Sequence, residues 1–258
     1  MTLTPKKRLG QHFLKDKNIA KKIVNSINIK PELVIEIGPG MGILTLFLKE
    51  KYLNFKTIEI DDEAINYLIA DEILSKNQII KGDFLKINLK NELLKNTVII
   101  GNFPYNISSQ IFFKILEHKD EITQIVCMLQ REVAKRLASP PGNKDYGILS
   151  VILQAYYNIE YLFVVPPHLF SPPPKVTSAV IRLTRNHKKN LGCDEHKFIE
   201  IIKVSFNQRR KTLKNSLKTF YDVKILNLPI FLKRPEQLNV DDFVNLVKLM
   251  KDDKIGSF

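Results

Sequence analysis

The stretch VIEIGPGMG, Val34 to Gly42, decides the fold prediction because it joins a buried strand to a glycine-rich turn. Residues 33–37 are β-branched or aliphatic except for one glutamate, which is typical of a strand buried on both faces. Glycines at 38, 40 and 42 permit a sharp turn and a close backbone approach to a ligand. Apolar residues at helical spacing follow. The order strand, glycine turn, helix is consistent with a dinucleotide site, a nucleoside site or only a tight turn.

Further strands are predicted along the chain, and helical patterns separate most of them. They cover residues 55–60, 78–80, 97–100, 124–129, 159–165 and 178–183. Strands connected by helical crossovers indicate a doubly wound α/β domain with a mostly parallel, Rossmann-like sheet. From Thr184 the chain becomes polar, and helical patterns without strand signals continue to the end. We therefore expect an α/β domain over residues 1–187 and a small helical domain over residues 188–258.

The net charge of +13 is concentrated at the two ends of the chain. Residues 1–30 carry a net charge of +7, residues 31–186 are neutral, and residues 187–258 carry +6. A neutral body with basic ends is the pattern expected of a protein that binds a polyanion such as nucleic acid. Ordinary solvated lysines are the alternative explanation.

The composition also excludes several classes of protein. Only Cys127 and Cys193 occur, so neither a disulfide framework nor a cysteine zinc site is indicated, and we expect no metal. No apolar run approaches the roughly 20 residues needed to span a bilayer, and the N-terminus has no signal-type apolar segment. A cytoplasmic protein without membrane contacts is predicted.

Polar residues stand where successive predicted strands end. Glu59 follows the second strand, 21 residues after Gly38, and an acidic side chain there can accept both hydroxyl protons of a ribose. Asp61 competes for this role. Asp83 and Phe84 follow the third strand and suit an adenine ring, and Asn102 follows the fourth. Because ligands bind at the carboxyl edge of such sheets, these residues are expected to line one crevice.

The spacing of the glycines favours a nucleoside without phosphates. A dinucleotide site prefers G-x-G-x-x-G, whereas Gly38, Gly40 and Gly42 give G-x-G-x-G, with Glu36 just before them. S-adenosylmethionine fits this pattern, and the chemistry would be methyl transfer. Gly38, Gly40, Glu59, Asp83, Phe84 and Asn102 are the predicted cofactor contacts.

The segment Asn102-Phe103-Pro104-Tyr105 is predicted to hold the methyl acceptor. The Asn102 side-chain oxygen and the Phe103 carbonyl would accept hydrogen bonds from an adenine amine, and Pro104 restricts Phe103 to extended conformations. Tyr105 offers a ring on which the base can stack. Positioning would carry catalysis. We expect Phe103 to act through its backbone. The alternative is that this segment is only a structural proline turn with buried aromatic rings.

Motifs over nearly the whole chain resemble the KsgA (RsmA) family of small-subunit ribosomal RNA adenine dimethyltransferases. They are RLGQHFLKD, VIEIGPGMGILT, IEID, GDF, GNFPYNISS, MLQREVAKRL, DYGILSV, FSPPPKVTSAVIRL and NQRRKTLKNSL. The resemblance implies a Rossmann-like methyltransferase sheet with a small C-terminal helical domain. It also implies S-adenosylmethionine as donor and N6 dimethylation of two adjacent adenosines near the 3′ end of the rRNA. Position 103 departs from the family, which more often has leucine there.

The resemblance adds further site residues. It implies cofactor contacts at His12 and Leu14, in an N-terminal arm that folds over the cofactor. It also implies that Phe170 holds the adenine against Tyr105, and packing in the core is the alternative role for Phe170. The partner would be small-subunit rRNA in an immature 30S particle, and we expect a monomer. Rival interpretations are a large-subunit rRNA methyltransferase of the macrolide-resistance type, a DNA adenine methyltransferase, and a non-catalytic ribosome assembly or transcription factor.

Basic residues near both ends are the predicted RNA contacts. At the N-terminus they are Lys6, Lys7 and Arg8. In the C-terminal domain the segment from Asn207 to Lys214 is predicted to open a helix, with Leu213 and Leu217 facing inward. Its predicted phosphate contacts are Arg209, Arg210, Lys211 and Lys214, and a solvated helix without RNA contacts is the alternative.

Overall fold

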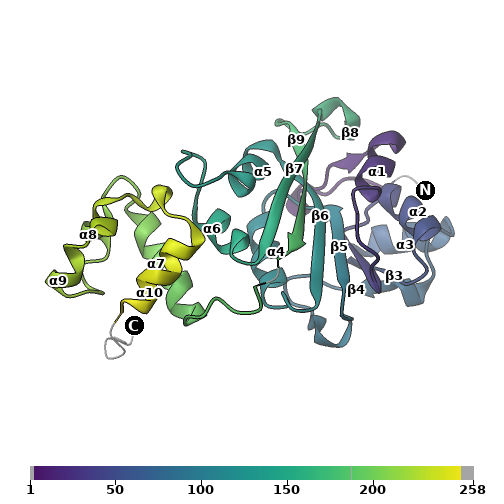
Figure 1. Ribbon diagram of the computed structural model, residues 1–258. Coiled ribbons are helices and arrows are strands. Elements are labelled where there is room, and N and C mark those ends of the chain that lie inside the picture. The colour runs from purple at the N-terminus through teal and green to yellow at the C-terminus, as the bar shows by residue number, and fades with distance from the viewer. Residues whose placement is uncertain (1–2, 187, 251–258) are drawn as a thin grey trace. The chain divides into compact units, whose positions relative to one another are not determined.

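The computed structural model describes residues 3–186 and 188–250, and it contains a seven-stranded sheet in the order β4-β3-β2-β5-β6-β9-β7 (Figure 1). The strands are β2 Leu33–Ile37, β3 Phe55–Glu59, β4 Ile79–Lys81, β5 Thr97–Asn102, β6 Ile122–Gln130, β7 Tyr157–Val165 and β9 Ser178–Arg185. Strands β4, β3, β2, β5 and β6 are parallel, and β9 runs antiparallel to β6. The predicted doubly wound α/β sheet is therefore confirmed.

The helices of the α/β part follow the strands in alternation. They are α1 Lys17–Val24, α2 Ile43–Lys51, α3 Asp62–Ala70, α4 Ser108–Leu116 and the start of α5 Arg131–Ala138, which continues into the second unit described below. Helices α1 and α2 lie side by side and pack their apolar residues on one face of the sheet, against Val34, Val98 and Val126. Side chains alternate between faces along a strand, and Ile35 and Ile99, which point the other way, are also fully buried. Both faces are thus covered, as the apolar strands require.

The register of the parallel strands brings their carboxyl ends to one edge. Ile37 pairs with Ile58 on one side and with Gly101 on the other, and Glu59 pairs with Lys81. The residues that follow β2, β3, β4 and β5 consequently lie next to one another. A separate two-stranded pairing joins β1 Phe13–Leu14 of the N-terminal arm to β8 Phe170–Ser171. Short 3-10 turns are η1 Lys7–Leu9, η2 Lys76–Gln78, η3 Leu89–Asn91 and η4 Pro167–Leu169.

The chain divides into two compact units. The first holds residues 1–134 and 158–185, and the second holds residues 135–157 and 186–258. The division expected from the sequence, 1–187 and 188–258, differs in the placement of residues 135–157; residues 1–2, 187 and 251–258 lie outside the described part. The difference arises because α6 Ile148–Gln154 packs against α7 Glu195–Asn207 and α10 Val240–Lys248. A contact between segments so far apart in the chain cannot be recognised from a local sequence pattern.

The second unit is helical, with its own buried residues. Besides α6, α7 and α10 it contains α8 Leu213–Ser216, α9 Val223–Leu226, η5 Pro229–Leu232 and η6 Pro235–Gln237. Phe198, Phe231 and Phe243 are fully buried there.

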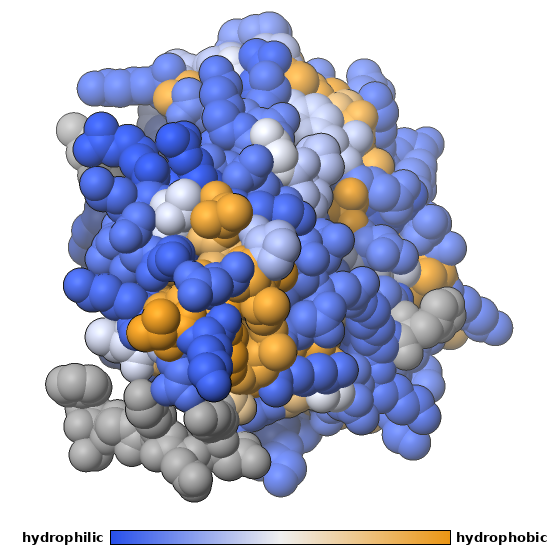
Figure 2. All heavy atoms as spheres, turned by 60° about the vertical axis from the view of Figure 1, so that its left-hand side comes forward, coloured by the Kyte–Doolittle hydropathy of each residue, from blue (hydrophilic) through white to orange (hydrophobic). Residues whose placement is uncertain are grey.

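Figure 2 shows a face that is largely hydrophilic and is interrupted by a group of hydrophobic side chains. Among the described residues, no helix is both long and apolar enough to cross a membrane.

Candidate active site

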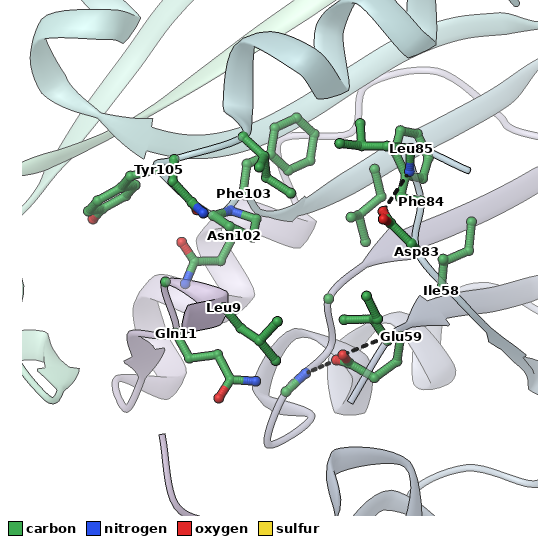
Figure 3. Close-up of a pocket in the computed structure, with 18 of the residues that line it drawn as sticks. Leu9, Gln11, Ile58, Glu59, Asp83, Phe84, Leu85, Asn102, Phe103 and Tyr105 are labelled. Carbon is green, nitrogen blue, oxygen red and sulfur yellow. Dashed lines mark hydrogen bonds between the residues drawn. The ribbon is translucent and has the colours of Figure 1, made fainter. Parts of the chain in front are cut away.

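A cavity of about 240 Å³ opens at the carboxyl edge of the sheet in the first unit (Figure 3). The ends of β2, β3, β4 and β5 form one side of it, and the N-terminal arm forms the other. Its lining includes the predicted residues His12, Gly38, Gly40, Glu59, Asp83, Phe84, Asn102, Phe103, Pro104 and Tyr105. The structure therefore brings together the four strand ends that the sequence singled out.

The glycine turn at the end of β2 needs glycine for its backbone and for its contacts. Gly38 and Gly40 have φ angles of +66° and +55°, which side-chain-bearing residues rarely adopt. A Cβ at Gly40 would lie 2.8 Å from the Phe13 ring. The turn thus lets the N-terminal arm pack directly on the loop that borders the cavity.

Glu59 is fixed at the end of β3 by backbone donors. Its carboxylate accepts hydrogen bonds from the N–H groups of Ile60 (2.8 Å), Asp61 (2.9 Å) and Gly40 (3.3 Å). Burial raises the pKa of Glu59, and these three hydrogen bonds oppose the rise because they favour the charged form. The side chain is 4% exposed and lines the cavity, so its orientation is set before any ligand binds.

Asp61, the other residue that the sequence offered for the ribose contact, is bonded to the N-terminal arm instead. Its carboxylate lies 2.5 Å from the Lys6 ammonium and accepts a 3.1 Å hydrogen bond from Gln11 Nε2. It also caps α3 by accepting from the N–H of Glu63. Burial alone would raise the pKa of Asp61, but the hydrogen bonds from Lys6 and Gln11 hold it below its ordinary value. Asp61 does not line the cavity, whereas Glu59 does.

Asp83 and Phe84 lie at the end of β4. Asp83 accepts a 3.0 Å hydrogen bond from the N–H of Leu85, which holds its carboxylate beside the cavity (Figure 3). Phe84 is 4% exposed and lines the cavity. This corner combines an acceptor with apolar surface, which suits a flat base carrying an amine.

Asn102 ends β5 and donates a 2.8 Å hydrogen bond from Nδ2 to the His12 carbonyl. The oxygen Oδ1 of the same amide takes no part in this bond. The Phe103 ring is 1% exposed and packs edge-on against Phe112, with 5.8 Å between the ring centroids. The ring thus belongs to the hydrophobic core, as the expectation that Phe103 acts through its backbone requires.

Two aromatic rings of the cavity lining, those of Tyr105 and His12, lie together. The Tyr105 and His12 rings are stacked, with 5.7 Å between centroids and 26° between planes. The Tyr105 hydroxyl is 2.6 Å from Ser178 Oγ, and His12 Nδ1 is 2.9 Å from the Pro172 carbonyl. Ser178 was not predicted from the sequence. Its contact with Tyr105 joins residues 73 positions apart, and a serine at a strand start carries no distinguishing signal.

Phe170, which the resemblance implies holds the adenine against Tyr105, has the alternative role of core packing in this structure. It is 1% exposed, belongs to the apolar core and does not line the cavity. The reason is its position opposite Leu14 in the β1–β8 pairing. Leu14 itself lines a smaller cavity of about 30 Å³ that shares Phe13, Gly38 and Asn102 with the larger one.

Glu36 also borders the smaller cavity, and it is 1% exposed. Thr45 donates a 2.7 Å hydrogen bond to its carboxylate. Burial raises the pKa of Glu36 to about 8, despite this hydrogen bond, and the charge of Glu59 adds to the rise. The group is thus mainly protonated at neutral pH in the ligand-free protein.

This pKa predicts a pH-dependent stability. The unfolded carboxyl ionises near 4.5, whereas the native one keeps its proton up to about 8, so the free energy of unfolding should fall as the pH rises through this window. The glutamine of Glu36→Gln cannot ionise. Over that window the free energy of unfolding of this variant should therefore fall by roughly 2–4 kcal/mol less than that of the wild type. Denaturant unfolding at its two ends measures the difference. Glu50→Gln, at an exposed position, is the control; equal pH dependence in all three proteins would contradict the assignment.

The basic segment of the second unit differs in structure from the prediction. Asn207 ends α7 instead of opening a helix, a turn follows, and α8 begins at Leu213. Leu213 and Leu217 are fully buried, which confirms that they face inward.

The basic side chains of this segment are not equally available. Arg209 donates to the Lys144 carbonyl and lies 3.9 Å from Glu236. Lys214 donates a 2.9 Å hydrogen bond to Asn227. Arg210 and Lys211 are exposed. In the N-terminal arm Lys6 is paired with Asp61 and Glu63, Arg8 lines the cavity, and the Lys7 side chain lies outside the described part. Within residues 3–186 and 188–250, no group of three His, Cys, Asp or Glu side chains is placed to hold a metal.

Nearly the whole chain matches a known protein family. The family described as "Ribosomal RNA adenine dimethylase" matches residues 2–252. The chain belongs to this family. It is an enzyme family of S-adenosylmethionine-dependent rRNA adenine methyltransferases, in agreement with the resemblance found in the sequence.

Relatives and solved structures agree with this membership. The chain is 52% identical over 252 residues to "Ribosomal RNA small subunit methyltransferase A" of Bacteroides thetaiotaomicron, covering 96% of this chain and 94% of the relative. It is 51% identical to the protein of that name from Porphyromonas gingivalis, with 97% and 99% covered. A dimethyladenosine transferase from Plasmodium falciparum has a TM-score of 0.78 at 26% identity, covering 91% and 96%. The 23S rRNA methyltransferase ErmE, at a TM-score of 0.66 and 24% identity with 92% and 99% covered, shares the fold.

Proposed function

We propose that this protein dimethylates the N6 amines of two adjacent adenosines near the 3′ end of small-subunit rRNA, with S-adenosylmethionine as donor. The observation that carries the proposal is the convergence of Gly38, Glu59, Asp83 and Asn102 on one cavity. The small-subunit relatives at about half identity favour this substrate over large-subunit rRNA.

The cofactor would lie along the strand ends. Glu59, held by three backbone donors, would accept both ribose hydroxyl protons, and two charge-assisted hydrogen bonds make this the strongest polar contact. Asp83 would take the exocyclic amine of the cofactor's adenine, with Phe84 beside the ring. His12 and Phe13 of the arm would cover it, and Leu14 would border the end of the cofactor that enters the smaller cavity.

The reaction would be a direct displacement in which the bound donor supplies an electrophilic methyl group. Asn102 Oδ1 and the Phe103 carbonyl would accept the two N–H bonds of the target amine and aim its nitrogen lone pair at that methyl. As the N–C bond forms, the S–C bond breaks, and the alkylated nitrogen then loses a proton to solvent. The amine becomes acidic only after alkylation, so no strong general base is needed and catalysis rests on positioning.

The acceptor base would rest on Tyr105. The 2.6 Å hydrogen bond between the tyrosine hydroxyl and Ser178 Oγ holds the hydroxyl end of this ring in place. The adenine must leave its helical stack to enter the cavity. Because the His12 ring already lies on the Tyr105 ring, entry of the base requires that His12 be on the opposite face or move.

RNA binding would combine the basic arm with the second unit. Arg8 stands at the cavity, and Arg210 and Lys211 are exposed in the turn after α7. We further propose that the substrate is an immature small subunit, that the protein acts as a monomer, and that it works in the cytoplasm, where that substrate is assembled.

Arg210→Ala combined with Lys211→Ala is expected to weaken RNA binding. Each lost phosphate contact lowers the slope of log K against log salt concentration by about 0.7 for single-stranded RNA, so the pair should lower it by about 1.4. Binding measured at several salt concentrations gives the slope. The control is Lys90→Ala with Lys95→Ala, which removes the same charge from exposed positions in the first unit. A slope equal to that of the wild type would assign Arg210 and Lys211 no phosphate contact.

The product of the reaction tests the proposed chemistry. Small-subunit rRNA treated with the protein and S-adenosylmethionine should yield N6,N6-dimethyladenosine after digestion to nucleosides, with the monomethyl form only as a transient. A digest containing methylation on another base or on the ribose would contradict the proposal.

A further inference from the structure

The N-terminal arm, defined here as residues 6–14, forms one wall of the cavity. Six consecutive residues of it line that wall, namely Arg8, Leu9, Gly10, Gln11, His12 and Phe13. A cofactor bound at the strand ends would therefore be enclosed between the sheet edge and the arm. The contacts that fix the arm would then govern how fast the cofactor enters and leaves.

The C-terminal end of the arm is fixed by backbone contacts. Phe13 and Leu14 pair with Ser171 and Phe170 as β1 and β8, and Asn102 donates to the His12 carbonyl. Phe13 and Leu14 are 8% and 5% exposed. This end is anchored in the core and gives no means of release.

The N-terminal end of the arm is held through side chains, chiefly at the Asp61 carboxylate. Asp61 Oδ1 lies 2.5 Å from Lys6 Nζ, and Asp61 Oδ2 accepts a 3.1 Å hydrogen bond from Gln11 Nε2. Glu63 lies 3.0 Å from the same ammonium. The Gln11 amide oxygen accepts a 2.8 Å hydrogen bond from the Lys6 N–H, which closes the loop between the two arm residues. Both polar atoms of the Gln11 side-chain amide, Oε1 and Nε2, thus help to attach this end of the arm to Asp61.

The attachment point is next to the predicted ribose acceptor. Asp61 stands two residues after Glu59, and its N–H donates a 2.9 Å hydrogen bond to Glu59 Oε1. The Asp61 side chain is 1% exposed although it is charged. A buried carboxylate is costly unless it is paired, so Lys6 and Gln11 are needed where they lie.

We propose that Asp61, Lys6 and Gln11 form a latch that holds the arm over bound cofactor and so sets the rate at which cofactor and product exchange. Asp61 is then a positioning residue, not a ribose contact. The inference rests on the proposed function in that the cavity binds S-adenosylmethionine. It also removes Lys6 from the phosphate contacts, because its ammonium is already paired.

The test uses Lys6→Ala and Gln11→Ala in the full-length protein. Each should raise the dissociation rate of labelled S-adenosylmethionine, measured by chase without RNA, about tenfold, as expected for the loss of one hydrogen bond to a charged group. Combining Lys6→Ala with Asp61→Asn should add little to the larger single effect, because both remove the same pair. Lys6→Arg, which keeps the positive charge, should release S-adenosylmethionine as slowly as the wild type. The control Lys15→Ala removes the same charge at an exposed position just beyond the arm, and it should dissociate like the wild type.

Two further readouts separate the latch from cofactor binding in general. In ligand-free protein, hydrogen exchange at residues 8–11 should speed up in Lys6→Ala and Gln11→Ala but not in Lys15→Ala. Lys6→Ala should leave the salt dependence of RNA binding unchanged. Unaltered dissociation and exchange in both variants would overturn the latch while leaving the proposed function intact. Failure of the wild type to bind S-adenosylmethionine would instead overturn the proposed function.

Discussion

Asn102→Ala is expected to lower the rate of methyl transfer at least about 100-fold, the size of effect that misplacement of a reacting group produces. Asn102 Nδ2 is bonded to the His12 carbonyl, and this bond leaves Oδ1 as the acceptor for the target amine. Alanine removes that acceptor, so the amine nitrogen would no longer be aimed at the methyl group. Turnover with saturating RNA and cofactor measures the loss.

The same substitution also removes a contact with the arm, and the two effects can be separated. Loss of the bond to His12 should weaken cofactor binding by no more than about tenfold, the value of one hydrogen bond. Calorimetry with S-adenosylmethionine and a thermal unfolding curve supply these readouts. Asn25→Ala, at an exposed asparagine outside the cavity, is the control. Near-normal turnover of Asn102→Ala would contradict the acceptor role.

Glu59→Gln is expected to weaken S-adenosylmethionine binding roughly 10- to 100-fold. A carboxylate can accept both ribose hydroxyl protons with charge assistance, and hydrogen bonds to a charged group contribute about 1.5–3 kcal/mol. Glutamine keeps the shape but loses the charge and one acceptor. Calorimetry measures the change, and Asp62→Asn, which alters an exposed carboxylate three residues away, is the control. Unchanged affinity in Glu59→Gln would show that the ribose is held by another group.

The pKa of Glu59 adds a pH dependence to this binding. Burial raises the pKa, so in the free protein the carboxylate takes up a proton at a higher pH than an exposed glutamate would. The charged form is the one that accepts two protons from the ribose, and affinity should therefore fall as the pH is lowered through the raised pKa. In Glu59→Gln this dependence should be absent. Affinities measured across the acidic range in both proteins test it.

Much of the α/β sheet was predictable because its signals are local. Residues 33–37 match β2 at both ends, and the runs beginning at Phe55, Thr97 and Ser178 start β3, β5 and β9. The polar residues at the strand ends could also be placed together, since parallel strands share a carboxyl edge. Glu59, Asp83 and Asn102 line one cavity for that reason.

Features that depend on contacts between distant segments were not predictable. The pairing of Leu14 with Phe170 draws Phe170 into the core, although its motif implied a place opposite Tyr105. The packing of α6 against α7 and α10 moves residues 135–157 into the second unit. Lys6 looked like a free phosphate contact because Asp61 lies 55 positions away. In each case a hydrophobic or ionic partner far along the chain decides the outcome.

The position of the modified nucleotides tests the central claim most directly. The protein would be incubated with labelled S-adenosylmethionine and, in parallel, with immature small subunits, naked small-subunit rRNA, large-subunit rRNA and duplex DNA. Mapping of the label should then place two methyl groups on each of two adjacent adenosines near the 3′ end of small-subunit rRNA, most efficiently in the immature particle. Label confined to large-subunit rRNA or to DNA would contradict the account.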